Sequence, residues 1–295
     1  MGVRVLGKFR TGLAALALGL SLATPVLAQG FETGGKLLLT RGISTVEGAG
    51  GGGLSSWALI TGNETDRGIG ATAHATQVEL DDFRFQAAGF AVGLHDRFEF
   101  SWTRQRFDTR DAGAALGLGQ GFTFEQDVIG VKLRLLGDAV YAQDSWVPQL
   151  ALGIQHKSND QGAIVRAVGA ADDSGYDVYL AATKLYLDHS LLLNATVRWT
   201  EANQTGLLGF GGLDDHSLQG EFTAAYLVSR RLLVGAEYRF KPDNLGFATE
   251  DDWVDLFAAY AVNEHLTVTA AWVDLGSIAT FDDQRGFYLS LQAGF

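Results

Sequence analysis

Cysteine is absent from the 295-residue chain, proline occurs three times and methionine once. Without cysteine the chain has no disulfide, no thiolate metal ligand and no cysteine nucleophile. Positive charge is also scarce, with 22 Lys and Arg against 34 Asp and Glu. Nucleic-acid binding requires a basic face, so this balance argues against a nucleic-acid partner. Finally, the chain after residue 28 has no apolar run long enough for a transmembrane helix.

Residues 1–28 have the organisation of an export signal. Arg4, Lys8 and Arg10 precede an apolar stretch at 13–22, and Ala28 is a small residue suited to cleavage before Gln29. The apolar stretch is too short for a comfortable membrane span. The sequence therefore predicts an exported protein whose first 28 residues are removed.

Apolar and polar residues alternate along most of the remaining chain. The stretch "RFEFSWT" places Phe98, Phe100 and Trp102 on one face and Glu99 on the other, as in a strand buried on one side. Such segments run longer than the usual strand of about 5–6 residues, and tilted strands of about 9–11 residues can cross a bilayer. Because the apolar face of a membrane barrel meets lipid, we predict an all-β, antiparallel transmembrane β-barrel.

The alternating segments predict twelve strands, joined by connections of alternating length. Short turns on the periplasmic side and long outer loops are typical of such barrels. If 36–41 and 54–61 also joined the wall, the barrel would have fourteen strands. The predicted strands are 69–79, 83–94, 97–107, 122–136, 146–157, 175–187, 190–201, 216–228, 231–241, 251–262, 265–275 and 286–295.

A glycine-rich segment at 29–62 separates the export signal from the barrel at 63–295. Its run "VEGAGGGGLSSW" fits the spacing of a phosphate-binding loop, but Leu54 stands where lysine is required, which argues against a nucleotide ligand. Either the segment supplies the first wall strands or it folds into the barrel as a plug, where glycine permits close backbone contact. We favour the plug. The glycines at 209–212 are expected to form an ordinary turn of an outer loop.

The chain ends on an alternating strand that closes with Phe295. This ending resembles the insertion signal of bacterial outer-membrane barrels, which implies recognition by the barrel assembly machinery. Together with the export signal, it predicts a location in the bacterial outer membrane, in contact with lipid and lipopolysaccharide.

Three stretches resemble a bacterial outer-membrane β-barrel family known only as a domain of unknown function. They are "STVEGAGGGGLSSWALITG" (44–62), "DAGAALGLGQGFTFEQDVIGVKLR" (111–134) and "LLLNATVRWTEANQTGLLGFGG" (191–212). The resemblance covers most of the chain after the signal. It implies fold and location, and it brings no catalytic residue.

Five Asp-Asp pairs fall on connections that the topology places on the outer side. Carboxylate oxygens suit divalent cations, which could bridge to lipopolysaccharide phosphates, although solvated loop charge also explains the pattern. No other metal site is predicted, because the six histidines are scattered. The candidate cation ligands are Asp172, Asp173, Asp214, Asp215, Asp251 and Asp252.

The stretch "GIQHKSN" (153–159) resembles the G-x-x-H-x-S-N stretch of outer-membrane phospholipases. His156 and Ser158 lie two residues apart, so they share a strand face and could act as base and nucleophile. A third group must orient the histidine. Asp172 and Asp173 are the candidates for that role, because Asn159 points to the opposite face. An interfacial histidine followed by an ordinary turn is the alternative.

Charged residues of both signs are predicted to face the lumen. Since such charges are costly to bury unpaired, either water fills the lumen or the charges form a packed network. Neighbouring strands could pair Arg198 with Glu221, and Glu237 with Arg239. The predicted lumen residues are Glu99, Lys132, Arg134, Arg198, Glu221, Glu237, Arg239 and Asp255.

These patterns favour passive or selective passage of a small solute, or a structural role in the envelope. The alternative is a lipid acyl hydrolase that uses His156 and Ser158. No cofactor and no nucleotide is expected in any of these cases.

Overall fold

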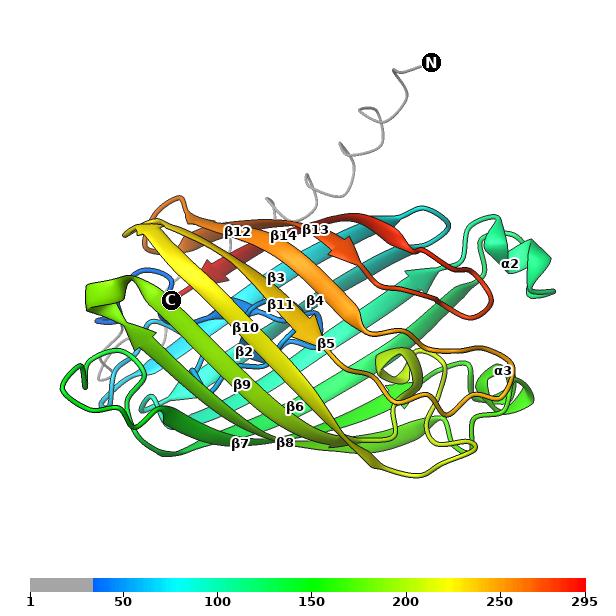
Figure 1. Cartoon of the computed structure of the whole chain (residues 1–295), viewed down its shortest axis with the longest axis horizontal. Helices are drawn as coiled ribbons and strands as arrows, with labels where there is room; N and C mark the ends of the chain where they lie inside the picture. The colour runs from blue at the N-terminus through cyan, green and yellow to red at the C-terminus, as the bar shows by residue number, and fades with distance from the viewer. Residues whose placement is uncertain (1–33) are drawn as a thin grey trace, which may run out of the picture.

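The computed structural model describes residues 34–295, so the predicted export signal lies outside the described residues. Twelve strands form one closed antiparallel barrel (Figure 1). They are β3 (Ile69–Leu80), β4 (Arg84–Leu94), β5 (Phe98–Asp108), β6 (Thr123–Leu136), β7 (Gln149–Asn159), β8 (Ser174–Tyr186), β9 (Leu191–Thr200), β10 (Ser217–Ser229), β11 (Leu232–Arg239), β12 (Trp253–Ala261), β13 (Leu266–Asp274) and β14 (Arg285–Gly294).

Each wall strand pairs with its neighbours in sequence, and β14 pairs with β3 to close the barrel. The prediction of a twelve-stranded antiparallel barrel is confirmed. The fourteen-stranded alternative is wrong, because the two further short strands, β1 (Ile43–Ser44) and β2 (Gly50–Gly51), form a separate sheet with each other.

Side chains alternate between the two faces of the wall, as the sequence pattern predicts. On β5 the outward Phe98 and Phe100 are 47% and 45% exposed, whereas the intervening Glu99 is 2% exposed. Apolar side chains outside and polar ones inside are what a barrel surrounded by lipid requires. No helix among the residues described here is long and apolar enough to cross a membrane.

The two ends of the barrel differ. The end that holds the C-terminus, here called the turn end, carries mostly tight connections. The opposite end, here called the loop end, carries α2 (Ala112–Ala115), α3 (Gly162–Ala167) and η3 (Asn203–Gly206) (Figure 1). All five Asp-Asp pairs lie in connections of the loop end. A further short helix, η2 (Leu187–His189), joins β8 to β9 at the turn end.

Residues 36–64, here called the inner segment, lie within the barrel (Figure 1). Every residue from 39 to 62 is buried, including Trp57. The segment begins and ends near the turn end, where Arg41 donates to the carbonyl of Glu264 and the Asn63 amide N–H donates to the carbonyl of Phe295. It therefore enters and leaves by the same end and occupies the lumen between.

A second segment folds into the barrel from the loop end. Residues 202–211, here called the mouth segment, are all buried, although they join β9 to β10. The glycines at 209–212 were expected to form an outer turn, but 209–211 belong to this buried segment. The reason is apolar burial, since Leu207, Leu208 and Phe210 are each at most 7% exposed.

Candidate functional site

Glu47 is the single carboxylate among residues 39–62, and it is bound by basic side chains of the wall. The Arg239 guanidinium binds the Glu47 carboxylate in a bidentate manner, with Nη1 at 3.0 Å from Oε2 and Nη2 at 3.1 Å from Oε1. The Lys157 ammonium also donates to Oε1, and Arg198 Nη2 lies 3.6 Å from Oε2. We call Lys157, Arg198 and Arg239 the cradle.

Two wall carboxylates bind the cradle from its other side. Asp177 lies 2.6 Å from the Lys157 ammonium and 3.1 Å from Arg198 Nη1. Glu221 lies 2.5 Å from Arg198 Nε. Every charge in this buried cluster therefore has an opposite partner, which a low-dielectric site requires.

A second contact joins the wall to the main chain of the inner segment. Lys132 donates to the carbonyls of Gly50 at 2.9 Å and Leu59 at 2.7 Å. Its cross-strand partner Glu99, at 3.1 Å, accepts from the Gly50 N–H at 3.0 Å and the Thr61 N–H at 2.8 Å. One ion pair thus satisfies both donors and acceptors of a segment with little regular structure of its own.

A third contact involves Glu237, which accepts from the Leu54 N–H at 2.8 Å and from the Thr223 hydroxyl at 2.8 Å. The expected pairing of Glu237 with Arg239 is absent among the ion pairs of the described chain, because Arg239 turns to Glu47 instead. The pairing of Arg198 with Glu221 is present.

Seven of the eight residues predicted to line the lumen are buried inside the barrel. Arg134 instead lies at the turn end, where it pairs with Asp96 and, at 3.5 Å, with Asp138. Sequence reasoning missed Glu47 and Asp177. Asp177 follows the alternation of β8, so its inward direction was readable, whereas the signal for Glu47 was its being the lone acid in a glycine-rich run.

The mouth segment is held by the buried ion pair of Lys241 with Glu250, whose charged atoms lie 3.6 Å apart. Glu250 accepts from the Gln204 N–H at 3.0 and 2.9 Å, and Lys241 donates to the Gln204 side chain at 3.0 Å. Burial raises the pKa of the Glu250 carboxyl, and burial lowers the pKa of the Lys241 ammonium to about 8. Gln204 and Thr205 have φ of 45° and 59°, a left-handed conformation that costs non-glycine residues about 1–2 kcal/mol each.

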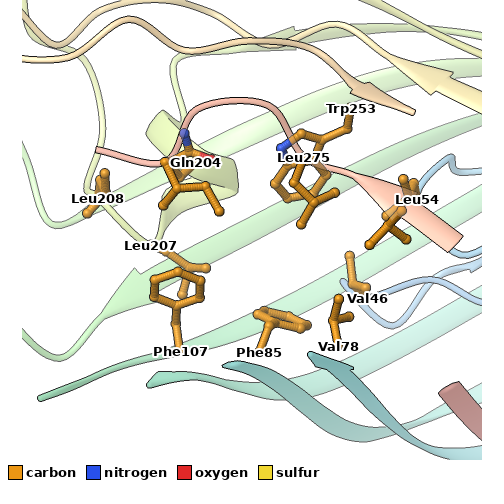
Figure 2. A pocket seen from close by; sticks show the side chains of 12 residues that line it. Val46, Leu54, Val78, Phe85, Phe107, Gln204, Leu207, Leu208, Trp253 and Leu275 are labelled. Atoms are coloured by element: carbon orange, nitrogen blue, oxygen red, sulfur yellow. The ribbon is translucent and has the colours of Figure 1, made fainter. Parts of the chain in front are cut away.

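A small apolar cavity of about 30 Å³ separates the inner segment from the mouth segment (Figure 2). Val46 and Leu54 line it on one side, and Leu207 and Leu208 on the other. Wall side chains such as Phe107 close it around the rim. The two segments therefore meet across apolar side chains at this cavity, and they are also joined through the cradle, because Lys157 donates both to Glu47 and to the carbonyl of Thr205.

His156 and Ser158 both lie on the outer face of β7, as predicted. The His156 ring packs against Tyr176, with centroids 4.7 Å apart. Among the described residues no hydrogen bond joins His156 to Ser158. The two candidate orienting groups, Asp172 and Asp173, instead pair with Arg166 at 3.0 and 2.9 Å. Neither aspartate therefore orients the histidine.

The predicted cation ligands also find protein partners. The Asp251 carboxylate accepts from the Ser277 hydroxyl at 2.6 Å, and Asp252 accepts from the Tyr238 hydroxyl at 2.6 Å. Within residues 34–295 no group of three or more His, Asp or Glu side chains is placed to hold a metal ion. Asp214 and Asp215 are exposed, and cation binding at the loop end stays a prediction.

A closed antiparallel cylinder with an apolar outer face and a polar, filled interior is a β-barrel of the outer-membrane type. The chain belongs to the family described as "Protein of unknown function (DUF3034)", whose model matches residues 40–292. The predicted resemblance to an outer-membrane barrel family described as a domain of unknown function is thereby confirmed. A comparison with curated protein sequences gives no match.

Solved structures share the fold at low sequence identity. The "KdgM porin" has a TM-score of 0.51 at 9% identity, and the match covers 76% of this chain and 99% of that one. The "KdgM porin in complex with disordered oligogalacturonate" has a TM-score of 0.51 at 10% identity, with the same coverage. The outer membrane phospholipase A from Escherichia coli has a TM-score of 0.42 at 9% identity, covering 76% and 92%. The two porin matches show the fold alone.

Proposed function

We propose that this protein is a closed outer-membrane channel whose lumen opens to a small solute when the inner segment and the mouth segment move. The single observation that carries the proposal is that neither segment belongs to the wall. The twelve wall strands close on themselves, and their inward faces carry charged side chains such as Glu99, Lys132 and Arg198. A barrel without these two segments, here called the fillings, would have a polar lumen, as water-filled barrels do.

The contacts that hold the fillings favour movement. The inner segment is attached by apolar side chains such as Trp57, which belongs to the main buried cluster, and by hydrogen bonds from its main chain to wall residues such as Glu99 and Lys132. Water can replace the hydrogen bonds at modest net cost. A barrel built only for rigidity gains more from apolar packing, because buried ion pairs are poor sources of stability. In the mouth segment, the left-handed residues Gln204 and Thr205 store backbone strain.

The location follows from the same proposal. Export through a signal at residues 1–28, assembly through the terminal Phe295, and contact with lipid and lipopolysaccharide fit a barrel with an apolar outer face. Fractionation of cells that produce the full chain tests this, with recovery in the outer-membrane fraction as the expected result and recovery in a soluble fraction as the contrary one.

Planar-bilayer conductance tests the proposed passage. The intact barrel, a barrel that lacks residues 30–62, and a barrel that also has 203–210 replaced by a short Gly-Ser linker are compared, with folding verified by circular dichroism. We expect the intact protein to be almost silent and the doubly altered barrel to conduct in steps. A full-length variant with Glu47→Ala and Glu250→Ala, which loosens both segments without shortening the chain, should open more often than the intact protein.

A folded but silent doubly altered barrel would overturn the proposal and would leave the structural envelope role. If the shortened barrels do not fold, the full-length pair of substitutions decides alone, and equal silence in that variant and the intact protein also overturns passage. The acyl-hydrolase alternative has less support, because Asp172 and Asp173, the two candidates to orient His156, pair with Arg166 instead.

A further inference from the structure

The ion pairs around Glu47 balance in charge only when the inner segment is in place. The cradle carries three positive charges, and the wall sets two carboxylates against it, Asp177 and Glu221. The third carboxylate, Glu47, comes from the inner segment. When that segment leaves the lumen, the ion pairs seen at the cradle lack one carboxylate, and a net positive site faces the opened lumen.

The geometry of the cradle is that of a carboxylate receptor. Arg239 presents two parallel N–H donors to the two oxygens of Glu47, and this planar fork matches a carboxylate. Lys157 adds a point charge on one oxygen. Each of the three cradle side chains is at most 4% exposed, so the site is a built interior feature of the wall.

We propose that the cradle is a binding site for the carboxylate of a small organic anion, and that Glu47 occupies it in the closed state. The inference deepens the proposed function and rests on it for the route, since an anion reaches the cradle once the inner segment moves. An anion that binds the cradle excludes Glu47 and so favours the open barrel by mass action. A neutral molecule of the same shape lacks the charge that the cradle requires.

Chemical rescue tests the site without any conductance measurement. Glu47→Ala removes the carboxylate and leaves a space beside the cradle, and the probe is sodium acetate, with acetamide as its neutral counterpart at constant ionic strength. The readout is the urea midpoint of unfolding of the full chain in detergent micelles. We expect the midpoint of Glu47→Ala to fall and acetate to restore at least half of the loss, while acetamide restores none.

A matched control comes from Glu64, another buried glutamate of the inner segment, which lies away from the cradle beside Lys36. Acetate should leave Glu64→Ala unchanged. If acetate and acetamide act alike on Glu47→Ala, or if acetate restores Glu64→Ala equally, the site is not a carboxylate receptor. If Glu47→Ala folds only with acetate present, refolding yield becomes the readout and supports the site, whereas failure to fold with acetate present contradicts it.

The conducting, doubly altered barrel supplies an independent measurement. In a potassium chloride gradient its reversal potential should show that chloride is more permeable than potassium. Arg239→Gln should lower this permeability ratio at least twofold. An unchanged preference would count against the cradle. Rescue by acetate in a barrel that never conducts would leave the binding site standing and refute passage. Conductance without rescue would leave passage standing and refute the binding site, so each proposal can fail while the other holds.

Discussion

Lys132 and Glu99 face each other across β5 and β6 at 3.1 Å, and between them they bind the main chain of the inner segment at five atoms. Both side chains are 1% exposed. The pair therefore serves as an attachment of the filling to the wall, in addition to any stability it lends the two strands.

The first prediction concerns this attachment. Lys132→Met should lower the free energy of unfolding by about 3–5 kcal/mol, because it leaves Glu99 buried without its partner. The urea midpoint of unfolding in micelles measures the change. The matched control is Arg106→Met, whose partner is Glu125 and whose side chain is 57% exposed; that change should cost less than about 1 kcal/mol. Equal effects would show that the Lys132 pair is no more than a surface contact.

The free energy of unfolding should depend on pH because of Glu64. Burial raises the pKa of its carboxyl from 4.5 to about 7, although Lys36 opposes the shift. Because the folded state holds the proton more tightly, this contribution to stability is fully present below about pH 4.5 and is lost as the pH rises through about 7. The loss amounts to at most about 3 kcal/mol.

Glu64→Gln should remove that slope, so that its unfolding midpoint changes less than that of the parent between pH 5 and pH 8. The control Glu264→Gln, at a side chain that is 79% exposed, should keep the parental slope. A parental slope in Glu64→Gln would place the titration elsewhere.

Backbone strain at Thr205 in the mouth segment can be tested by comparing two substitutions. Thr205 adopts φ of 59°, where glycine carries no steric penalty. Thr205→Gly and Thr205→Ala remove the same hydroxyl and methyl groups, but Thr205→Ala keeps a Cβ in the left-handed region. The glycine variant should therefore be more stable than the alanine variant by about 1 kcal/mol. Thermal unfolding of both checks this, and the opposite order would mean that the strain is absent.

Lipid hydrolysis supplies a negative prediction. With no hydrogen bond between His156 and Ser158 among the described residues, and with Asp172 and Asp173 held by Arg166, the outer face lacks an assembled triad. Release of fatty acid from phospholipid vesicles, with calcium present, should be the same for the parent, His156→Ala and Ser158→Ala. A rate of fatty-acid release that falls in both variants would contradict this prediction and support the acyl-hydrolase alternative.

The wall could be predicted from the sequence because the two-residue alternation of its strands has a physical cause. A strand with lipid on one side and a polar lumen on the other cannot shift by one residue without exposing charge to lipid, so alternation locates all twelve strands. The same rule turns Glu99 and Arg198 inward. It does not choose their partners, and Arg239 binds Glu47 rather than its strand mate Glu237.

The fillings were harder to predict because they have no period. Residues 39–62 are positioned by donors and acceptors of the wall, which lie far away in sequence. The mouth segment resembles a glycine-rich loop, and its burial is signalled only by Leu207, Leu208 and Phe210 lying close together. Such contacts depend on the closed barrel, and local patterns do not encode them.

Re-addition of the inner segment as a separate peptide tests the central claim most directly. The doubly altered barrel is placed in a planar bilayer, and a synthetic peptide of residues 36–64 is added on the side of the turn end. We predict that the peptide lowers the conductance in a saturable way, and that a Glu47→Gln peptide needs a higher concentration for the same block. Conductance that the peptide leaves unchanged at every concentration, from either side, would contradict the claim that this segment closes the barrel.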